Sequence, residues 1–279
     1  MNKIIKLKWK DIEKLNKEKT CLFVTAAPVE EHGLHLPVSI DIDLGKYWEE
    51  STVLKLQNRY PDYNFLSLPT IPLASGSMKS FPGCIYIKPK TLRKVMTEYL
   101  GSIARWGIKY LVIIASHGDP LHNMAIEKAC RITNRRFGTS FISPMGSMFS
   151  YSELGIDLEF SQEVKNMLQE YPEDFHAGWI ETSLMLEINP EKVSPKFKNA
   201  EDVIVREKEM INPKIYIART AGKGHLGFPR FADAKLGRML NVSTVNFIVK
   251  VTEKLLNNED IKRYSRHFLN RIPFLRLMV

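Results

Sequence analysis

The sequence predicts an α/β protein with a mainly parallel central sheet. Short apolar runs alternate with longer amphipathic stretches, which is the order of strands joined by crossover helices. The run 110–115 is nearly all apolar and so indicates a strand covered on both faces, as in parallel sheets. Histidine-rich and acidic segments directly follow two of the apolar runs. Open α/β sheets place their ligand sites at such strand ends.

The first third of the chain is expected to form two helix–strand pairs. Apolar residues recur at helical spacing in two segments, and two apolar runs follow them. These elements are helix 9–19, strand 21–27, helix 44–57 and strand 65–71. The second strand ends before Pro72, and the loop 75–83 that follows is too long for a tight turn. Loops of that length are suited to lining a site.

The middle of the chain continues the alternation. Thr91 is a good N-cap for a helix, and Gly107 suits the position just after its end. Pro144 stops the last strand of this part. The expected elements are a short strand 85–87, helix 91–106, strand 110–115, helix 121–136 and strand 140–143.

The last third is more irregular, and its expected elements are helices 162–170, 180–186 and 232–257, with possible strands 203–205 and 215–218. The final segment, 261–279, mixes basic and apolar residues and is expected to pack on the body or on a neighbouring subunit. No internal repeat, low-complexity tract or linker divides the sequence. One domain over residues 1–279 is therefore expected.

Composition excludes several classes of protein. The 44% hydrophobic and 25% charged content are ordinary for a globular chain. The net charge of +9 is spread along the whole sequence, which disfavours a nucleic-acid face. Cys21, Cys84 and Cys130 lack metal-ligand spacing and suggest buried thiols in a reducing compartment. Without a signal-peptide core or an apolar run of roughly 18 residues, we expect a cytoplasmic protein without a membrane partner.

Metal-type side chains gather in three places. Glu30 and His32 follow the first strand and, being two apart, point the same way in an extended segment. Asp41 closes that stretch, His117 and Asp119 follow strand 110–115, and His176 precedes Glu181 in the third place. Neutral imidazole and carboxylate oxygen are preferred ligands of zinc, manganese and ferrous iron. Histidines that are merely solvated in a polar loop are the alternative.

If the parallel strands bring these segments together, two ions can bind with Asp41 between them. Glu30, Asp41 and His117 would hold the first ion, and His32, Asp41 and Asp119 the second. Such a pair activates water at neutral pH and polarises a carbonyl. His176 would then transfer protons, and Glu181 would be a further ligand or an acceptor that orients one.

The motifs that carry this chemistry resemble those of the creatininase (creatinine amidohydrolase) family. The pattern Glu-x-His-Gly-x-His-Leu-Pro in 30–37, followed by Asp41, resembles its metal-binding signature. Segments 75–77 with 81–83, 116–118, and 176–178 with 181–183 resemble its active-site loop, second metal segment and catalytic-histidine segment. Segment 224–237 resembles a late glycine-rich stretch more weakly. The resemblance runs from Trp9 to about Leu256, leaving 261–279 as a C-terminal extension.

The resemblance implies a three-layer α/β/α sandwich, two ions of zinc or manganese (iron in some members), and a homo-oligomer, usually a hexamer. It implies metal roles for Glu30, His32, Asp41, His117 and Asp119, a catalytic role for Asp119 as well, and proton transfer by His176. Substrate contacts are expected at a larger set of residues, namely Ser77, Gly83, Gly118 and Trp179.

The chain departs from the family pattern at Asp119-Pro120 and at Trp179, so the resemblance implies the hydrolytic class and not the substrate. The expected function is a metal-dependent hydrolase acting on a non-peptide C–N bond of a small cyclic amide or formamide. One alternative is a hydrolase that breaks a C–C bond in a cyclic ketone or diketone, and another is a ligand-binding member without catalysis. The expected partners are a small-molecule substrate and other copies of the chain, with no nucleic acid.

Overall fold

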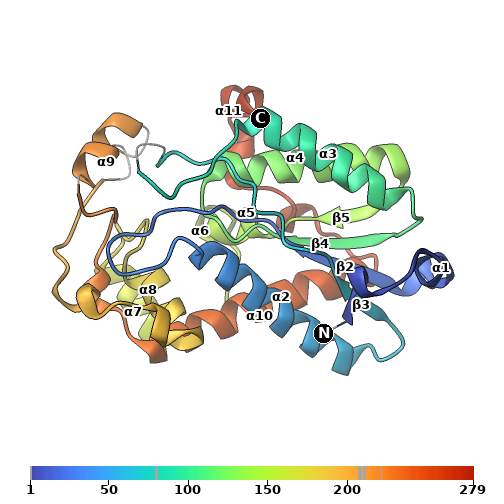
Figure 1. The fold of residues 1–279 in the computed structure, drawn as a ribbon, viewed down its shortest axis with the longest axis horizontal. Coiled ribbons are helices and arrows are strands. Elements are labelled where there is room, and N and C mark those ends of the chain that lie inside the picture. Colours follow the sequence, from blue (N-terminus) through green and yellow to red (C-terminus); the bar gives the residue numbers. More distant parts are fainter. Residues whose placement is uncertain (1, 79–80, 207–208, 210–211, 221) are drawn as a thin grey trace.

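The computed structural model describes residues 2–78, 81–206, 209, 212–220 and 222–279. Its centre is a five-stranded, fully parallel sheet with the strand order β1-β3-β2-β4-β5 (Figure 1). The strands are β1 (Asn2–Lys3), β2 (Thr20–Thr25), β3 (Asn64–Ser67), β4 (Tyr110–Ile114) and β5 (Ser140–Ile142). Every residue of β2 and β4 is buried, as their apolar runs predicted. The edge strand β1 was not predicted, because two residues carry no readable periodicity.

Helices cover both faces of the sheet, which confirms the three-layer α/β/α prediction (Figure 1). On one face lie α3 (Pro89–Ala104) and α4 (Pro120–Phe137). On the other lie α2 (Ile40–Arg59) and α10 (Ala234–Leu256), with α8 (Trp179–Ile188) packed against both. The side chain of Asp233 accepts from the backbone N–H groups of Lys235 and Leu236 and so caps the start of α10.

The remaining helical elements are short. They are α1 (Trp9–Lys14), α5 (Met145–Phe149), α6 (Tyr151–Leu154), α7 (Gln162–Glu170), α9 (Pro213–Arg219), α11 (Pro273–Met278) and 3₁₀ turns at Ile4–Lys6, Lys17–Lys19, Pro190–Lys192, Pro195–Asn199, Pro229–Phe231, Lys262–Tyr264 and Phe268–Arg271. Helix α7 has the predicted bounds. Within the described residues, every helix is too short or too polar to cross a membrane.

Several predicted elements differ from the structure. The helix expected over 9–19 breaks after α1, because the Asn16 side chain accepts from the Glu18 N–H and caps a new turn. The strand expected to reach Ile71 ends at Ser67, where Pro69 soon removes a donor from the ladder. Helix α3 begins at Pro89 rather than at Thr91, since proline suits the first helical position.

Three short predicted strands are not strands. Residues 85–87 make only a single bridge, between Tyr86 and Ala74, and 203–205 only one between Val203 and Gly227. Residues 215–218 lie inside the helix α9, so that prediction was wrong. Four residues with two isoleucines in alternation fit a strand or a helix equally well.

The strand order reverses direction between β2 and β4. Helix α2 connects β2 to β3 on one face of the sheet. Helix α3 connects β3 to β4 on the opposite face. The carboxyl ends of β2 and β4 therefore form a switch point, the usual ligand site of open α/β sheets. Helix α2 approaches closely there, since a Cβ at Gly45 would lie 2.5 Å from both Ser116 Oγ and Thr25 Cγ2.

The final segment, 261–279, packs on the body of the chain, as one of the two expectations had it. The backbone N–H of His267 and the Nδ2 of Asn270 donate to Glu127 of α4 at 2.8 Å each. The Phe268 N–H donates to Ser150 Oγ at 3.1 Å. These contacts fasten the segment to α4 and to the turn between α5 and α6.

Candidate metal centre

The loop after β2 turns back on itself and directs two ligand-type side chains to the same point. Gly33 adopts a left-handed backbone with φ +68°, which glycine tolerates best. The Glu30 N–H donates to the carbonyl of Val38 at 3.0 Å. His32 Nδ1 lies 3.0 Å from the Glu30 carbonyl, so it donates there and leaves the Nε2 lone pair facing the cluster. The side chains of Glu30 and His32 are almost fully buried.

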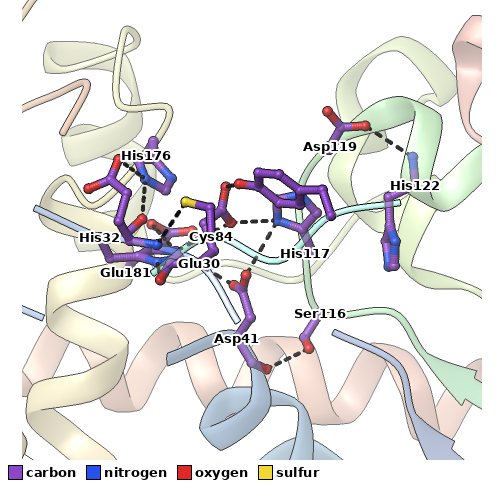
Figure 2. Close-up of polar contacts among 12 residues, drawn as sticks. Glu30, His32, Asp41, Cys84, Ser116, His117, Asp119, His122, His176 and Glu181 are labelled. Atoms are coloured by element: carbon purple, nitrogen blue, oxygen red, sulfur yellow. Dashed lines mark hydrogen bonds and ion pairs between the residues drawn. The ribbon is translucent and has the colours of Figure 1, made fainter. Parts of the chain in front are cut away.

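The first group of facing side chains is Glu30, Asp41 and His117 (Figure 2). His117 Nδ1 lies 3.0 Å from Glu30 Oε2 and 3.3 Å from Asp41 Oδ2. Asp41 stands in the first turn of α2, and its carbonyl accepts from Ser116 Oγ at 2.6 Å. The ends of β2 and β4 and the start of α2 thus supply one residue each.

The second group is His32, Asp41 and Glu181. His32 Nε2 lies 3.7 Å from Asp41 Oδ1 and 3.6 Å from Glu181 Oε2. Glu181 lies in the first turn of α8, and its carboxylate also accepts from the Ala177 N–H. Asp41 therefore directs Oδ2 to the first group and Oδ1 to the second, as expected of a carboxylate shared between two ions.

Charges in this cluster require a cation. Burial raises the pKa of Asp41. Burial also opposes ionisation of Glu30, yet the nearby His117, His176 and His32 hold the pKa of Glu30 well below its usual range. Burial disfavours a charged His117, but Glu30 and Asp41 raise its pKa well above the usual value. Two carboxylates packed this closely are stabilised by a positive charge between them, and the His117 ring lies at that place.

Unpartnered atoms test whether metal ions fit. Among the described residues, Glu30 Oε2, Asp41 Oδ2 and His32 Nε2 are buried and lack a hydrogen-bond partner. Such orphaned atoms are costly unless something else satisfies them. All three are ligand atoms for zinc, manganese or iron, and they face one another. The residues present fit divalent ions.

His176 lies beside these groups (Figure 2) and faces Glu31. Its Nε2 lies 2.9 Å from the Glu31 carbonyl and 3.6 Å from Glu31 Oε1. The rings of His176 and His32 have centroids 4.3 Å apart. Burial disfavours the charged ring, but Glu31, Glu30 and Glu181 raise the pKa of His176 to about 10. This histidine is placed to hold a proton at the edge of the cluster.

Asp174 holds the His176 segment in shape. Its carboxylate accepts from the backbone N–H groups of Trp179, Ile180 and Phe228 at 2.9 Å each. A Cβ at Gly178 would lie 1.8 Å from Asp174 Oδ1, so this close approach requires glycine. Asp174 thereby joins the start of α8 to the segment before α10. No local pattern in the sequence points to Asp174, because its partners are backbone groups as far away as residue 228.

Asp119 lies apart from the two groups, unlike the sequence-based expectation. Its Oδ1 accepts from the His122 N–H at 3.0 Å and caps α4 (Figure 2). Within the described chain, three groups could hold an ion, the third being Glu30, His32 and His176, and none of them contains Asp119. The Asp-Pro pair explains the difference, because proline at the first helical position places Asp119 at the N-cap.

The expected substrate contacts have different surroundings. Gly118 is exposed, with nothing near a hypothetical Cβ, and Gly83 is exposed with φ +91° beside Val38. Ser77 is half-buried in the loop between Ala74 and Gly83. The substrate contact expected of Trp179 does not agree with the structure, since its side chain is 0% exposed in the hydrophobic core.

Two residues near the cluster escaped the sequence analysis. Tyr86 donates its hydroxyl to Glu30 Oε1, and Cys84 Sγ accepts from the Glu31 N–H at 3.4 Å. Burial and the Glu30 carboxylate raise the pKa of Tyr86, so it acts as a neutral donor. Both residues follow the glycine-containing loop 75–83. That loop was the one signal that could have directed attention to them.

Comparison with known proteins agrees with the fold and the motifs. Residues 6–252 match the family model Creatininase, described as creatinine amidohydrolase. Two curated relatives are mycofactocin precursor peptide peptidases, 26% identical over 176 residues in Mycobacterium ulcerans and 25% identical over 174 residues in Mycolicibacterium smegmatis. Each match covers 62% of this chain but only 60% and 59% of the respective relatives.

Solved creatininase structures share the fold at low sequence identity. A tryptophan-to-alanine mutant creatininase has a TM-score of 0.66 at 20% identity and covers 90% of this chain and 98% of its own. A structure named Creatininase Mn has a TM-score of 0.65 at 20% identity and covers 90% of this chain and 98% of its own. A glutamate-to-glutamine mutant creatininase of Zn–Zn type has a TM-score of 0.66 at 20% identity and covers 90% of this chain and 97% of its own. With its family-model match over residues 6–252, the chain belongs to the creatininase family of hydrolases.

Proposed function

We propose that this chain is a dinuclear metal-dependent hydrolase of an amide-type C–N bond. Glu30, Asp41 and His117 would hold one divalent ion, and His32, Asp41 and Glu181 the other. The observation that carries the proposal is the orientation of the Asp41 carboxylate. Its Oδ2 lies 3.3 Å from His117 of the first group, and its Oδ1 lies 3.7 Å from His32 of the second. The orphaned buried atoms beside it support the same assignment.

Zinc, manganese or iron bound there would supply Lewis acidity toward a carbonyl and lower the pKa of a coordinated water. The chain itself supplies the proton donor. His176 Nε2 carries a proton toward the Glu31 carbonyl, 2.9 Å away, and the neighbouring Glu31 side chain raises the pKa of the ring. A charged imidazole can protonate the departing nitrogen of an amide. The choice of metal depends on supply, because this donor set accepts all three.

For the substrate, we propose a small cyclic amide or a formamide. The family model is described as creatinine amidohydrolase, and creatinine is a cyclic amide. A second candidate is a peptide bond in a short peptide, favoured by the two relatives named as precursor peptide peptidases. Release of ammonia or an amine from a small compound would support the first candidate, and cleavage of peptides alone would support the second. Cleavage of a cyclic diketone without nitrogen release would replace both.

The first experiment measures metal content by plasma mass spectrometry on protein purified without chelators. The wild type should carry about two ions per chain, and Asp41→Ala close to none, because Asp41 serves both groups. Asp43→Ala is the matched control. Asp43 lies in the same turn of α2 but binds Ser39 and Lys192 instead, so its loss should leave the metal content unchanged. A wild type that takes up no zinc, manganese or iron would refute the proposal and favour a ligand-binding protein.

The second experiment assays metal-loaded protein against cyclic amides, formamides, short peptides and cyclic diketones. His176→Asn should keep the metal content and lose most of the turnover, by about 100-fold or more, the contribution typical of a general acid–base group. Equal turnover by the wild type and His176→Asn would remove His176 from the mechanism while leaving the metal assignment intact.

We also propose that the chain forms a homo-oligomer. Large apolar side chains are exposed at both ends of the chain, with Trp9 68%, Phe274 68% and Leu277 72% exposed. Exposed apolar side chains of this size favour association. Light scattering coupled to size-exclusion chromatography would report the mass, and a monomer at micromolar concentration would contradict the proposal.

A further inference from the structure

Tyr86 contacts the proposed first metal site from a part of the chain that supplies no ligand. Its hydroxyl donates to Glu30 Oε1. Its ring lies nearly parallel to that of His117, with centroids 6.4 Å apart and an interplanar angle of 26°. Tyr86 therefore contacts two of the three residues of the first group.

The surrounding chain is shaped to hold this ring. Tyr86 forms a bridge with Ala74, and the Ile87 N–H donates to the Ala74 carbonyl at 2.9 Å. A Cβ at Gly76 would lie 2.3 Å from the Tyr86 ring, so only glycine leaves the space that the ring fills. On another side the ring packs against a small apolar cluster that includes Met78 and Leu226. The orientation of the phenol is thus determined by packing.

This contact makes the two oxygens of Glu30 unequal. Oε1 accepts from the Tyr86 hydroxyl, whereas Oε2 has no hydrogen-bond partner among the described residues and lies 3.0 Å from His117 Nδ1. A carboxylate with one oxygen bound to a fixed donor cannot rotate freely. The oxygen without a donor, Oε2, is the one that faces His117 and the first group.

We infer that Tyr86 is a positioning residue that holds Glu30 with Oε2 toward the first group and so sets the metal affinity of the first site. The inference rests on the proposed metal-dependent function. Hydrogen bonds to ligating carboxylates orient them, and losing such a bond typically weakens metal binding about 10- to 100-fold. The second group contains neither Glu30 nor His117, so its affinity should not change.

The test is Tyr86→Phe, which removes the hydroxyl and keeps the ring. Zinc and manganese affinities are measured by chelator competition, both in the otherwise unchanged chain and in a Glu181→Gln background that isolates the first site. We expect a fall of about 10- to 100-fold at the first site. The melting temperature of the metal-free protein should fall by no more than a few degrees, because ring packing is preserved and only the hydroxyl's hydrogen bond to Glu30 is lost. Tyr99→Phe, the same change in α3 far from the site, should alter neither quantity.

The outcomes separate two failures. If the wild type binds two ions and Tyr86→Phe binds the first as tightly as the wild type, the positioning role is wrong and the proposed function stands. If the wild type binds no ion, the proposed function fails and the inference fails with it. If Tyr86→Phe weakens both ions equally, Tyr86 acts through general packing, and the inference is also overturned.

Discussion

Two buried glutamates in this protein have opposite surroundings. Glu127 of α4 is 1% exposed, and each of its oxygens accepts a hydrogen bond, one from the His267 N–H and one from Asn270 Nδ2. Glu30 is 2% exposed, and only its Oε1 has a donor. Burial raises the pKa of Glu127 to about 8, whereas neighbouring histidines outweigh burial and lower that of Glu30.

The difference shows how the chain separates structural carboxylates from those available for chemistry. Glu127 is satisfied by the segment that it fastens, and Asp174 likewise by three backbone N–H groups. Glu30 and Asp41 keep an unpartnered oxygen each. A buried polar atom without a partner is costly, so its presence in two adjacent carboxylates supports the metal sites proposed above.

The largest expected effect is the loss of a whole bound ion. Glu181→Gln should reduce the metal content from about two ions to about one, because Glu181 belongs to the second group only. Asp119→Asn should keep both ions, since Asp119 caps α4. Plasma mass spectrometry of the two variants shows which of the two residues, Glu181 or Asp119, is needed for the second ion. Loss of an ion from Asp119→Asn, with none from Glu181→Gln, would show that Asp119 completes the second site.

The next effect is on folding. Asp174→Ala removes the acceptor of three backbone N–H groups, and each unsatisfied donor costs about 1–3 kcal/mol. We expect the free energy of unfolding to fall by about 3 kcal/mol or more, measured by urea denaturation of the metal-free protein. Asp157→Ala is the control, because the exposed Asp157 accepts only from the nearby Glu159 N–H. A similar, small loss in both variants would contradict the structural role of Asp174.

A third effect depends on pH. Because the folded-state pKa of Glu127, about 8, lies above the ordinary value near 4.5, the folded protein retains a proton that the unfolded chain releases between these values. Glu127 should therefore make the free energy of unfolding fall as pH rises from about 4.5 to about 8, by at most about 1.4 kcal/mol per pH unit. Above about pH 8, Glu127 should cause no further change in the free energy of unfolding.

The measurement compares unfolding free energies of wild type and Glu127→Gln across this range. The amide cannot titrate, so the difference between the two proteins should change with pH and level off above about pH 8. His267 beside it does not titrate over most of the range, since burial lowers its pKa to about 4. If the unfolding free energies of the two proteins changed with pH in parallel, Glu127 would have the same pKa in the folded and unfolded states, and the prediction would be wrong.

The smallest effect concerns Glu30 in the metal-free protein. Glu30→Gln relieves the repulsion between Glu30 and Asp41 but also removes the partner of His117, and these two changes oppose each other. We expect an unfolding free energy within about 1 kcal/mol of the wild type, or higher, together with weakened metal binding. A large destabilisation would mean that Glu30, like Glu127, serves the fold.

Most of the body and part of the site could be predicted because their signals are local. The apolar runs of β2 and β4 were recognisable without any partner, since a strand buried on both faces is apolar throughout. Glu30, His32 and His117 follow those runs directly, so their place at the sheet edge came from strand ends alone. Helix α9 was mistaken for a strand because so short a segment has no distinct period.

The sequence by itself determined the layered fold, the strands that carry the ligands and the residue types gathered at their ends. The tertiary structure alone decided that Glu181 rather than Asp119 faces His32, that Trp179 is in the core, and that Tyr86 reaches Glu30. The physical reason is range. Periodicity and ligand chemistry act over a few neighbouring residues, whereas a contact such as Tyr86 with Glu30 depends on how distant loops pack around glycines that leave room for them.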